Sequence, residues 1–85
     1  MIMKFYRWPK GGIFVDEYFA IYENGILFFE PSRREEWIFH CSEWNSYYNN
    51  YKQHLYQVSC LEVLVMCGSV PTKEDFKEAK ANQRR

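Results

Sequence analysis

The dipeptide Asn24-Gly25 constrains the fold of this chain more than any other short stretch. Apolar runs flank it over residues 13–23 and 26–30. Both residues tolerate the positive φ angles of a two-residue type I′ turn, and this pair is the strongest local signal for a β-hairpin. The pattern therefore predicts an antiparallel hairpin in which Glu23 pairs with Ile26, with each further pair one residue outward along both strands.

Both faces of that hairpin are apolar. An antiparallel sheet with one wet side alternates apolar and polar residues along each strand, and neither run does so. Each side of the sheet must therefore be covered, by other parts of the chain or by another molecule. The register places Ala20, Tyr22, Leu27 and Phe29 on one face and Phe19, Ile21, Ile26 and Phe28 on the other.

A further strand is predicted before the hairpin. Residues 1–8 are rich in β-prone aromatic and aliphatic side chains. The stretch 9–12 then breaks the run, because its proline lacks a backbone donor and its two glycines allow positive φ. The first half of the chain thus reads as strands joined by turns.

The segment 33–58 allows two interpretations. Ser32 and Glu35 match a capping box, and apolar residues keep helical spacing from there on, as one long helix would require. Residues 37–40, however, are β-prone, and Ser42 could cap a later helix. We favour a strand over 37–40 followed by a helix over 43–57, with the single long helix as the alternative.

The predicted helix over 43–57 is unusual because most of its apolar residues are tyrosines. At about 100° per residue, its apolar side chains fall within an arc of about 100°, while asparagines and glutamines occupy the other side. We interpret this stripe as one side of the core lying on the sheet, rather than as a surface for stacking bases or binding a partner. The stripe comprises Trp44, Tyr47, Tyr48, Tyr51, Leu55 and Val58.

The last third of the chain carries two capping patterns. Ser59 and Glu62 precede the apolar run 60–67, which fits a helix and a buried strand equally well. A proline, a threonine cap and an acidic first turn predict a second helix over 72–82, and the last few residues are expected to fray. The predicted fold is a single α+β domain, 1–85: a small antiparallel meander of three to four strands packed against the tyrosine-rich helix, with a short C-terminal helix.

Charge and cysteine content restrict the function. Eleven basic and eleven acidic residues give a net charge of zero, which argues against a domain devoted to neutralising phosphates. No apolar run approaches the length of about 18 residues that spans a bilayer, and no secretory signal is visible at the start. Three cysteines without such a signal indicate reduced thiols, so we expect a cytoplasmic protein without membrane contact.

No metal, cofactor or catalytic residue is predicted. The histidines and cysteines lack the pairwise spacing of metal ligands, and the adjacent His40 and Cys41 are expected on opposite sides of a strand. A small enzyme that uses one cysteine and one histidine is conceivable, but no orienting third group is recognisable. It ranks third among the functions considered.

The second-ranked function is binding of nucleic acid or a nucleotide. Aromatic residues on a sheet can stack bases with little help from charge. The first strand mixes such residues with basic ones, although outward basic residues are also common on edge strands. The candidate residues are Lys4, Tyr6, Arg7, Trp8 and Lys10.

The favoured function is a non-enzymatic protein-interaction module. One helix can cover one sheet face, so the other should remain exposed, and exposed contiguous apolar area marks an interface. Such a module would bind a protein partner or form a homodimer, and could act as a small regulator or inhibitor of a larger protein or enzyme complex, as small phage and mobile-element proteins do. The predicted contact residues are Phe19, Ile21, Ile26 and Phe28.

Overall fold

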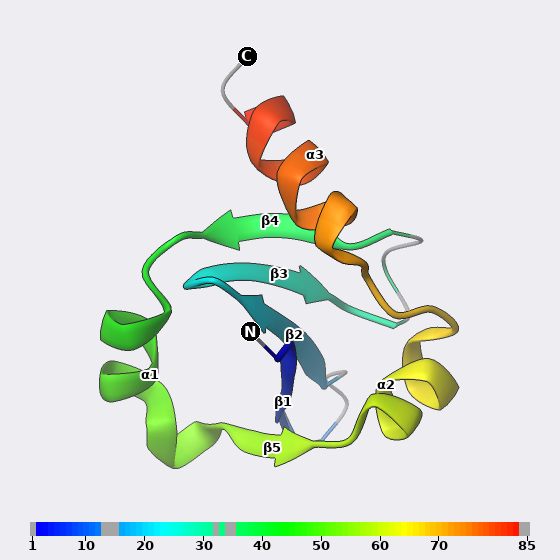
Figure 1. The fold of residues 1–85 in the computed structure, drawn as a ribbon. Helices are drawn as coiled ribbons and strands as arrows, with labels where there is room; N and C mark the ends of the chain where they lie inside the picture. Colours follow the sequence, from blue (N-terminus) through cyan, green and yellow to red (C-terminus); the bar gives the residue numbers. More distant parts are fainter. Residues whose placement is uncertain (1, 13–15, 32, 34–35, 84–85) are drawn as a thin grey trace.

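Five strands form one antiparallel sheet in the order β4-β3-β2-β1-β5, with helices on both of its faces (Figure 1). The computed structural model describes residues 2–12, 16–31, 33 and 36–83. It confirms the α+β class, although the sheet has one strand more than the largest number predicted. The elements are β1 (Lys4–Trp8), β2 (Glu17–Tyr22), β3 (Gly25–Phe29), β4 (Ile38–Cys41), α1 (Trp44–Tyr51), the 3₁₀ helix η1 (Lys52–His54), β5 (Tyr56–Val58), α2 (Cys60–Cys67) and α3 (Lys73–Gln83).

The hairpin between β2 and β3 is present, but its turn lies one residue earlier than predicted. Glu23 and Asn24 have positive φ angles of 48° and 68°, and Gly25 already belongs to β3, where it pairs with Tyr22. The predicted pairing of Glu23 with Ile26 is therefore wrong. The error leaves the faces unchanged, because moving the turn by one residue shifts each pairing by two, and side chains alternate with a period of two.

Gly25 serves a different purpose from the one that the sequence suggested. A Cβ atom at this position would lie 3.2 Å from the Tyr22 carbonyl oxygen and 3.6 Å from the ring of Phe76 on α3. The glycine is needed for close packing rather than for a positive φ angle. Asn24 instead caps α1: its carbonyl oxygen accepts from the Trp44 amide at 3.1 Å, and its side-chain oxygen accepts from the Asn45 amide at 3.2 Å.

Helix α1 covers the sheet face that was expected to be open. The chain leaves β4 at one edge of the sheet, passes through α1 and η1, and joins β5 at the opposite edge (Figure 1). Phe19, Ile21 and Ile26 are buried beneath it, and Phe28 is half-buried. The prediction that these four residues form a free sheet face is therefore wrong, because in the folded chain they belong to the core.

The opposite face is covered by α2 and α3. Phe5, Tyr18, Ala20 and Leu27 from the first three strands are buried there. Val63 of α2 and Phe76 of α3 complete that core cluster, so two short helices suffice to cover this face. The expectation that too little chain would remain to cover the second face underestimated these two elements.

The tyrosine-rich helix lies on the sheet as predicted, but it ends earlier. α1 stops at Tyr51, and Tyr56–Val58 form β5, which pairs with β1. Pairing satisfies backbone groups that β1 would otherwise expose at a sheet edge, and this long-range gain outweighs the local helical pattern. Leu55 still packs beneath α1, whereas Val58 packs on the opposite face, so it is not part of the helical stripe.

The remaining boundaries follow the local signals. β4 forms at Ile38–Cys41, one residue later than predicted, so the strand-plus-helix interpretation of 33–58 is correct. The open choice for 60–67 resolves as a helix, α2, which Ser59 caps and which ends at Gly68 with a φ angle of 79°. Thr72 and Asp75 cap α3 reciprocally. The proposed box at Ser32 and Glu35, and the expected fraying of 84–85, lie outside the described residues.

Candidate functional site: the outer face of α2

Exposed apolar side chains gather on α2 rather than on the sheet. Four large apolar residues of this eight-residue helix are 48% to 71% exposed, while Val63 is fully buried against the sheet. An ordinary surface helix turns charged and polar residues to water on its outer side. The four residues are Leu61, Leu64, Val65 and Met66.

Helical geometry places three of these side chains together. At about 100° per residue, Leu61, Leu64 and Val65 fall within an arc of about 100° that points away from the buried Val63. Met66 lies outside this arc, with Glu62 between it and Val65, so the α2 face is defined here as Leu61, Leu64 and Val65. The helix therefore presents a continuous apolar strip to solvent, and such strips mark sites of interaction.

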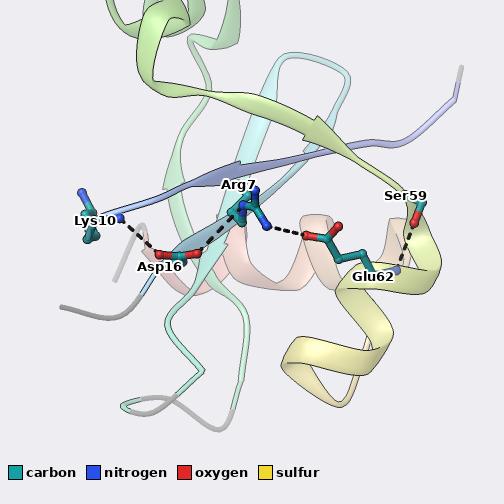
Figure 2. A network of polar contacts seen from close by, with 5 residues as sticks. All are labelled: Arg7, Lys10, Asp16, Ser59 and Glu62. Atoms are coloured by element: carbon teal, nitrogen blue, oxygen red, sulfur yellow. Dashed lines mark hydrogen bonds and ion pairs between the residues drawn. The ribbon is translucent and has the colours of Figure 1, made fainter. Parts of the chain in front are cut away.

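A network of polar contacts holds the charge of α2 at the flank of the helix, beside β1. Glu62, the one charged residue of α2, places Oε2 at 3.3 Å from Nη1 of Arg7 on β1 (Figure 2). Its backbone amide donates to Oγ of Ser59 at 3.1 Å. Asp16 lies 3.9 Å from Nε of Arg7 and accepts from the Lys10 amide at 3.2 Å. The pairing of Glu62 with Arg7 leaves the α2 face uncharged.

The inner side of α2 is dry, in contrast to its outer face. Burial raises the pKa of the Cys67 thiol to about 11, so very little thiolate exists there at neutral pH. Cys60, at the other end of the helix, is exposed. Val63 and Cys67 thus pack α2 against the sheet. The residues on the outer side of the helix can contact another molecule.

The five residues of the candidate nucleic-acid site do not gather on one surface. Tyr6 is buried beneath α1, in ring contact with Trp44 at 4.8 Å, whereas Arg7 points to the opposite face and pairs with Glu62. Lys10 pairs with Glu17 at 2.7 Å and lies 4.1 Å from the ring centre of Trp8. Lys4 is exposed. The arrangement does not create a row of free cations and rings along which a strand could run, so nucleic-acid binding stays a prediction that the geometry does not favour.

An aromatic cluster fills the space between α1 and the sheet. Tyr47 contacts Phe19 at 5.8 Å between ring centres, and Tyr51 contacts Trp8 at 5.4 Å. His54 stacks on Trp8 at 5.0 Å with the ring planes only 4° apart. Burial, reinforced by the nearby charge of Glu17, raises the pKa of Tyr47 to about 12. Phe19 is buried and Trp8 and Tyr47 are half-buried, so these rings belong to the core as the helical stripe predicted, whereas Tyr51 and His54 lie exposed at its rim.

No metal centre is visible in the described part of the chain. An irregularity between β3 and β4 pairs Ile26 with Cys41 and Leu27 with Phe39, so the intervening His40 has no partner of its own. His40 contacts Phe28 and Tyr47, and Cys41 packs on the same cluster, so the expectation that His40 and Cys41 lie on opposite sides is wrong. Even so, the described residues contain no group of three histidine, cysteine or acidic side chains that could hold a metal ion.

Comparison of the chain with protein-family models, with curated proteins and with solved structures finds no match in any of the three. No helix within the described residues is long and apolar enough to cross a membrane. The function must therefore be argued from the geometry. The sequence did contain a signal for the α2 face: all residues of the run 60–67 except Glu62 are apolar or cysteine, and a short helix of that kind must face apolar surface on more than one side.

Proposed function

We propose that this protein is a non-enzymatic interaction module whose contact surface is the α2 face, and that the surface binds a second copy of the same chain. The observation that carries the proposal is the exposure of Leu61, Leu64 and Val65 on one side of a helix whose single charged residue, Glu62, pairs with Arg7. The pair would be related by a two-fold axis, the commonest symmetry of homo-oligomers.

Charge favours a second copy as the occupant. In a two-fold contact each residue meets the same surface on the partner, so a charged patch would oppose its own charge. The α2 face carries no charge, and the whole chain has a net charge of zero, so neither local nor overall repulsion keeps two copies apart. A copy of the chain is thus electrostatically matched to this surface.

The size of the surface fits a weak dimer. Complete burial of an apolar side chain gains about 1.5–3 kcal/mol, so burying what the α2 face exposes on two copies would gain roughly 6–11 kcal/mol. Association costs roughly 4–15 kcal/mol in lost translational and rotational freedom. The two terms are comparable, and we expect a dissociation constant between about 1 μM and about 1 mM.

Light scattering across a concentration series tests the proposal. The mass of the wild-type protein should rise from 10.4 kDa toward twice that value between about 10 μM and about 1 mM. Leu64→Lys should hold the protein at the monomer mass, because a charge at the centre of the α2 face would oppose its own copy. The matched control is Ile2→Lys, since Ile2 is 85% exposed but lies outside α2.

Two outcomes would refute the proposal. One is a wild-type protein that keeps the monomer mass over the whole concentration range. The other is a dimer that persists unchanged in Leu64→Lys, which would place the contact elsewhere. Circular dichroism of both variants checks that the fold is retained, as expected for substitutions of exposed residues.

The narrower roles remain predictions. Regulation or inhibition of a larger protein is consistent with a small module that associates through one helix. The three free cysteines suit a reducing compartment, so the location we propose is the cytoplasm. The raised pKa of Cys67 gives no support to the cysteine-dependent enzyme, which stays the least favoured function.

A further inference from the structure

A second surface, separate from the α2 face, lies where β4 meets α3. A groove with a volume of about 540 Å³ opens between them. α3 runs past β4 and continues beyond the edge of the sheet, so the groove follows the outermost strand (Figure 1). Its walls comprise residues 36–39 from β4 and the preceding turn, 69–70 from the α2–α3 connection, and Asp75, Glu78, Ala79 and Asn82 from α3.

β4 is an edge strand that carries no charged side chain. Among the described strands it has only β3 as a neighbour, so the backbone on its other side lacks a strand partner. The sequence Ile-Phe-His-Cys contains no lysine or proline, and the strand is protected instead by its shortness, by the irregularity at His40 and by α3 packing against it, which leaves part of its outer backbone without a strand partner. Such an edge can accept one more strand from an extended peptide.

The rim of the groove is acidic, and aromatic residues line its base. Glu36 and Glu78 are exposed on its rim and make no ion pair with any described residue, and the described lining contains no lysine or arginine. Asp75 is already engaged, because it accepts from the Thr72 amide at 2.7 Å. Trp37 and Phe39 are half-buried against the core beneath.

One polar atom of the groove lining is unsatisfied. Nε1 of Trp37 is buried and has no hydrogen-bond partner among the described residues. An unpaired buried donor is costly, but this atom has almost no accessible surface and does not select a ligand. The outer edge of β4 and the two rim carboxylates call for two features in one ligand: an extended backbone and positive charge.

We propose that the groove between β4 and α3 binds an extended peptide segment carrying lysine or arginine, which adds to the sheet as a strand beside β4. The basic side chains lie against Glu36 and Glu78, and alternate apolar side chains lie over Trp37 and Phe39. This site does not depend on the α2 face, so each can exist without the other.

Nuclear magnetic resonance titration of the full chain tests the proposal. The probe is a blocked octapeptide of alternating lysine and valine, added to about 2 mM because single-strand contacts are weak. The indole N–H signal of Trp37 and the amide signals of β4 should shift, whereas the indole signals of Trp8 and Trp44 beneath α1 should not. Binding should weaken as salt is raised, because the rim carboxylates are exposed.

Matched variants separate the groove from general attraction to acidic residues. Glu78→Gln and Glu36→Gln should each weaken binding roughly twofold to fivefold, as expected for an exposed ion pair. The control is Glu74→Gln, because Glu74 lies one turn earlier on α3, pairs with Lys77 and does not line the groove. It should leave binding unchanged.

The proposal fails under any of three results. The first is a lack of any shift at Trp37 and β4 at the highest peptide concentration. The second is equal binding of an octapeptide of alternating glutamate and valine. The third is equal binding of the lysine peptide after N-methylation of alternate residues, since that modification removes the donors a new strand must supply.

Discussion

Tyr47 shows at the residue scale how a tyrosine can replace an aliphatic side chain in a helix that covers a sheet. Its ring contacts Phe19 of β2 and His40 of β4, so it joins α1 to two strands. Because the Tyr47 hydroxyl lies in a partly buried position, it ionises less easily than in water, and its pKa rises to about 12. A small domain gains large contact area in this way without long flexible side chains.

That pKa predicts how stability changes in alkali. The folded protein holds the Tyr47 proton more tightly than the unfolded chain does, whose tyrosines titrate near 10.0. Its contribution is complete below about pH 10 and is lost as the pH rises toward about 12. Tyr47→Phe, which keeps the ring, should therefore show a smaller fall in urea midpoint between about pH 9.5 and about pH 11.5 than the wild type.

The matched control for this experiment is Tyr56→Phe, because the Tyr56 side chain is 54% exposed on β5. Its urea midpoint should fall with pH as that of the wild type does. If Tyr47→Phe also follows the wild-type curve, the hydroxyl of Tyr47 is not a source of alkaline instability. That result would contradict the position of the ring between α1 and the sheet.

At the scale of elements, the structure depends on contacts that local sequence cannot encode. The run 43–57 reads as one helix, yet its last residues become β5 because the edge of β1 lies within reach. The turn between β2 and β3 lies one residue earlier than predicted for a related reason, because both of its residues make long-range contacts. Asn24 hydrogen-bonds to the start of α1, and Gly25 leaves space for Phe76 of α3. By contrast, the caps at Ser59 and Thr72 involve neighbours only three residues away, and these could be predicted.

The contact between Asn24 and α1 yields a stability prediction. Asn24→Gly keeps a residue that accepts positive φ but removes the side-chain acceptor of the Asn45 amide. It should lower the free energy of unfolding by about 0.5–2 kcal/mol, the usual loss for a missing N-cap. Denaturant unfolding measures the difference.

Asn24→Asp is the matched control, because it retains an acceptor and places a negative charge at the helix N-terminus. It should be as stable as the wild type or slightly more stable. Equal destabilisation by glycine and aspartate would show that Asn24 contributes through its turn conformation rather than by capping α1.

At the scale of the whole molecule, both faces of the sheet are covered by the chain itself, and the surplus apolar surface lies on α2. The sequence correctly indicated that both faces are apolar and that more apolar surface exists than one helix can hide. It could not show where the surplus remains, because that depends on how 52–83 wraps around the sheet edge. Glu62 also pairs with Arg7, a residue far away in the chain. The sequence alone therefore could not predict that the α2 face is uncharged.

Isotope-filtered nuclear Overhauser spectroscopy on a mixture of labelled and unlabelled protein, at about 1 mM, most directly tests the claim that the α2 face joins two copies. The account predicts intermolecular contacts among the methyl groups of Leu61, Leu64 and Val65, and their disappearance in Leu64→Lys. Intermolecular contacts confined to other surfaces, or their complete absence at that concentration, would contradict it.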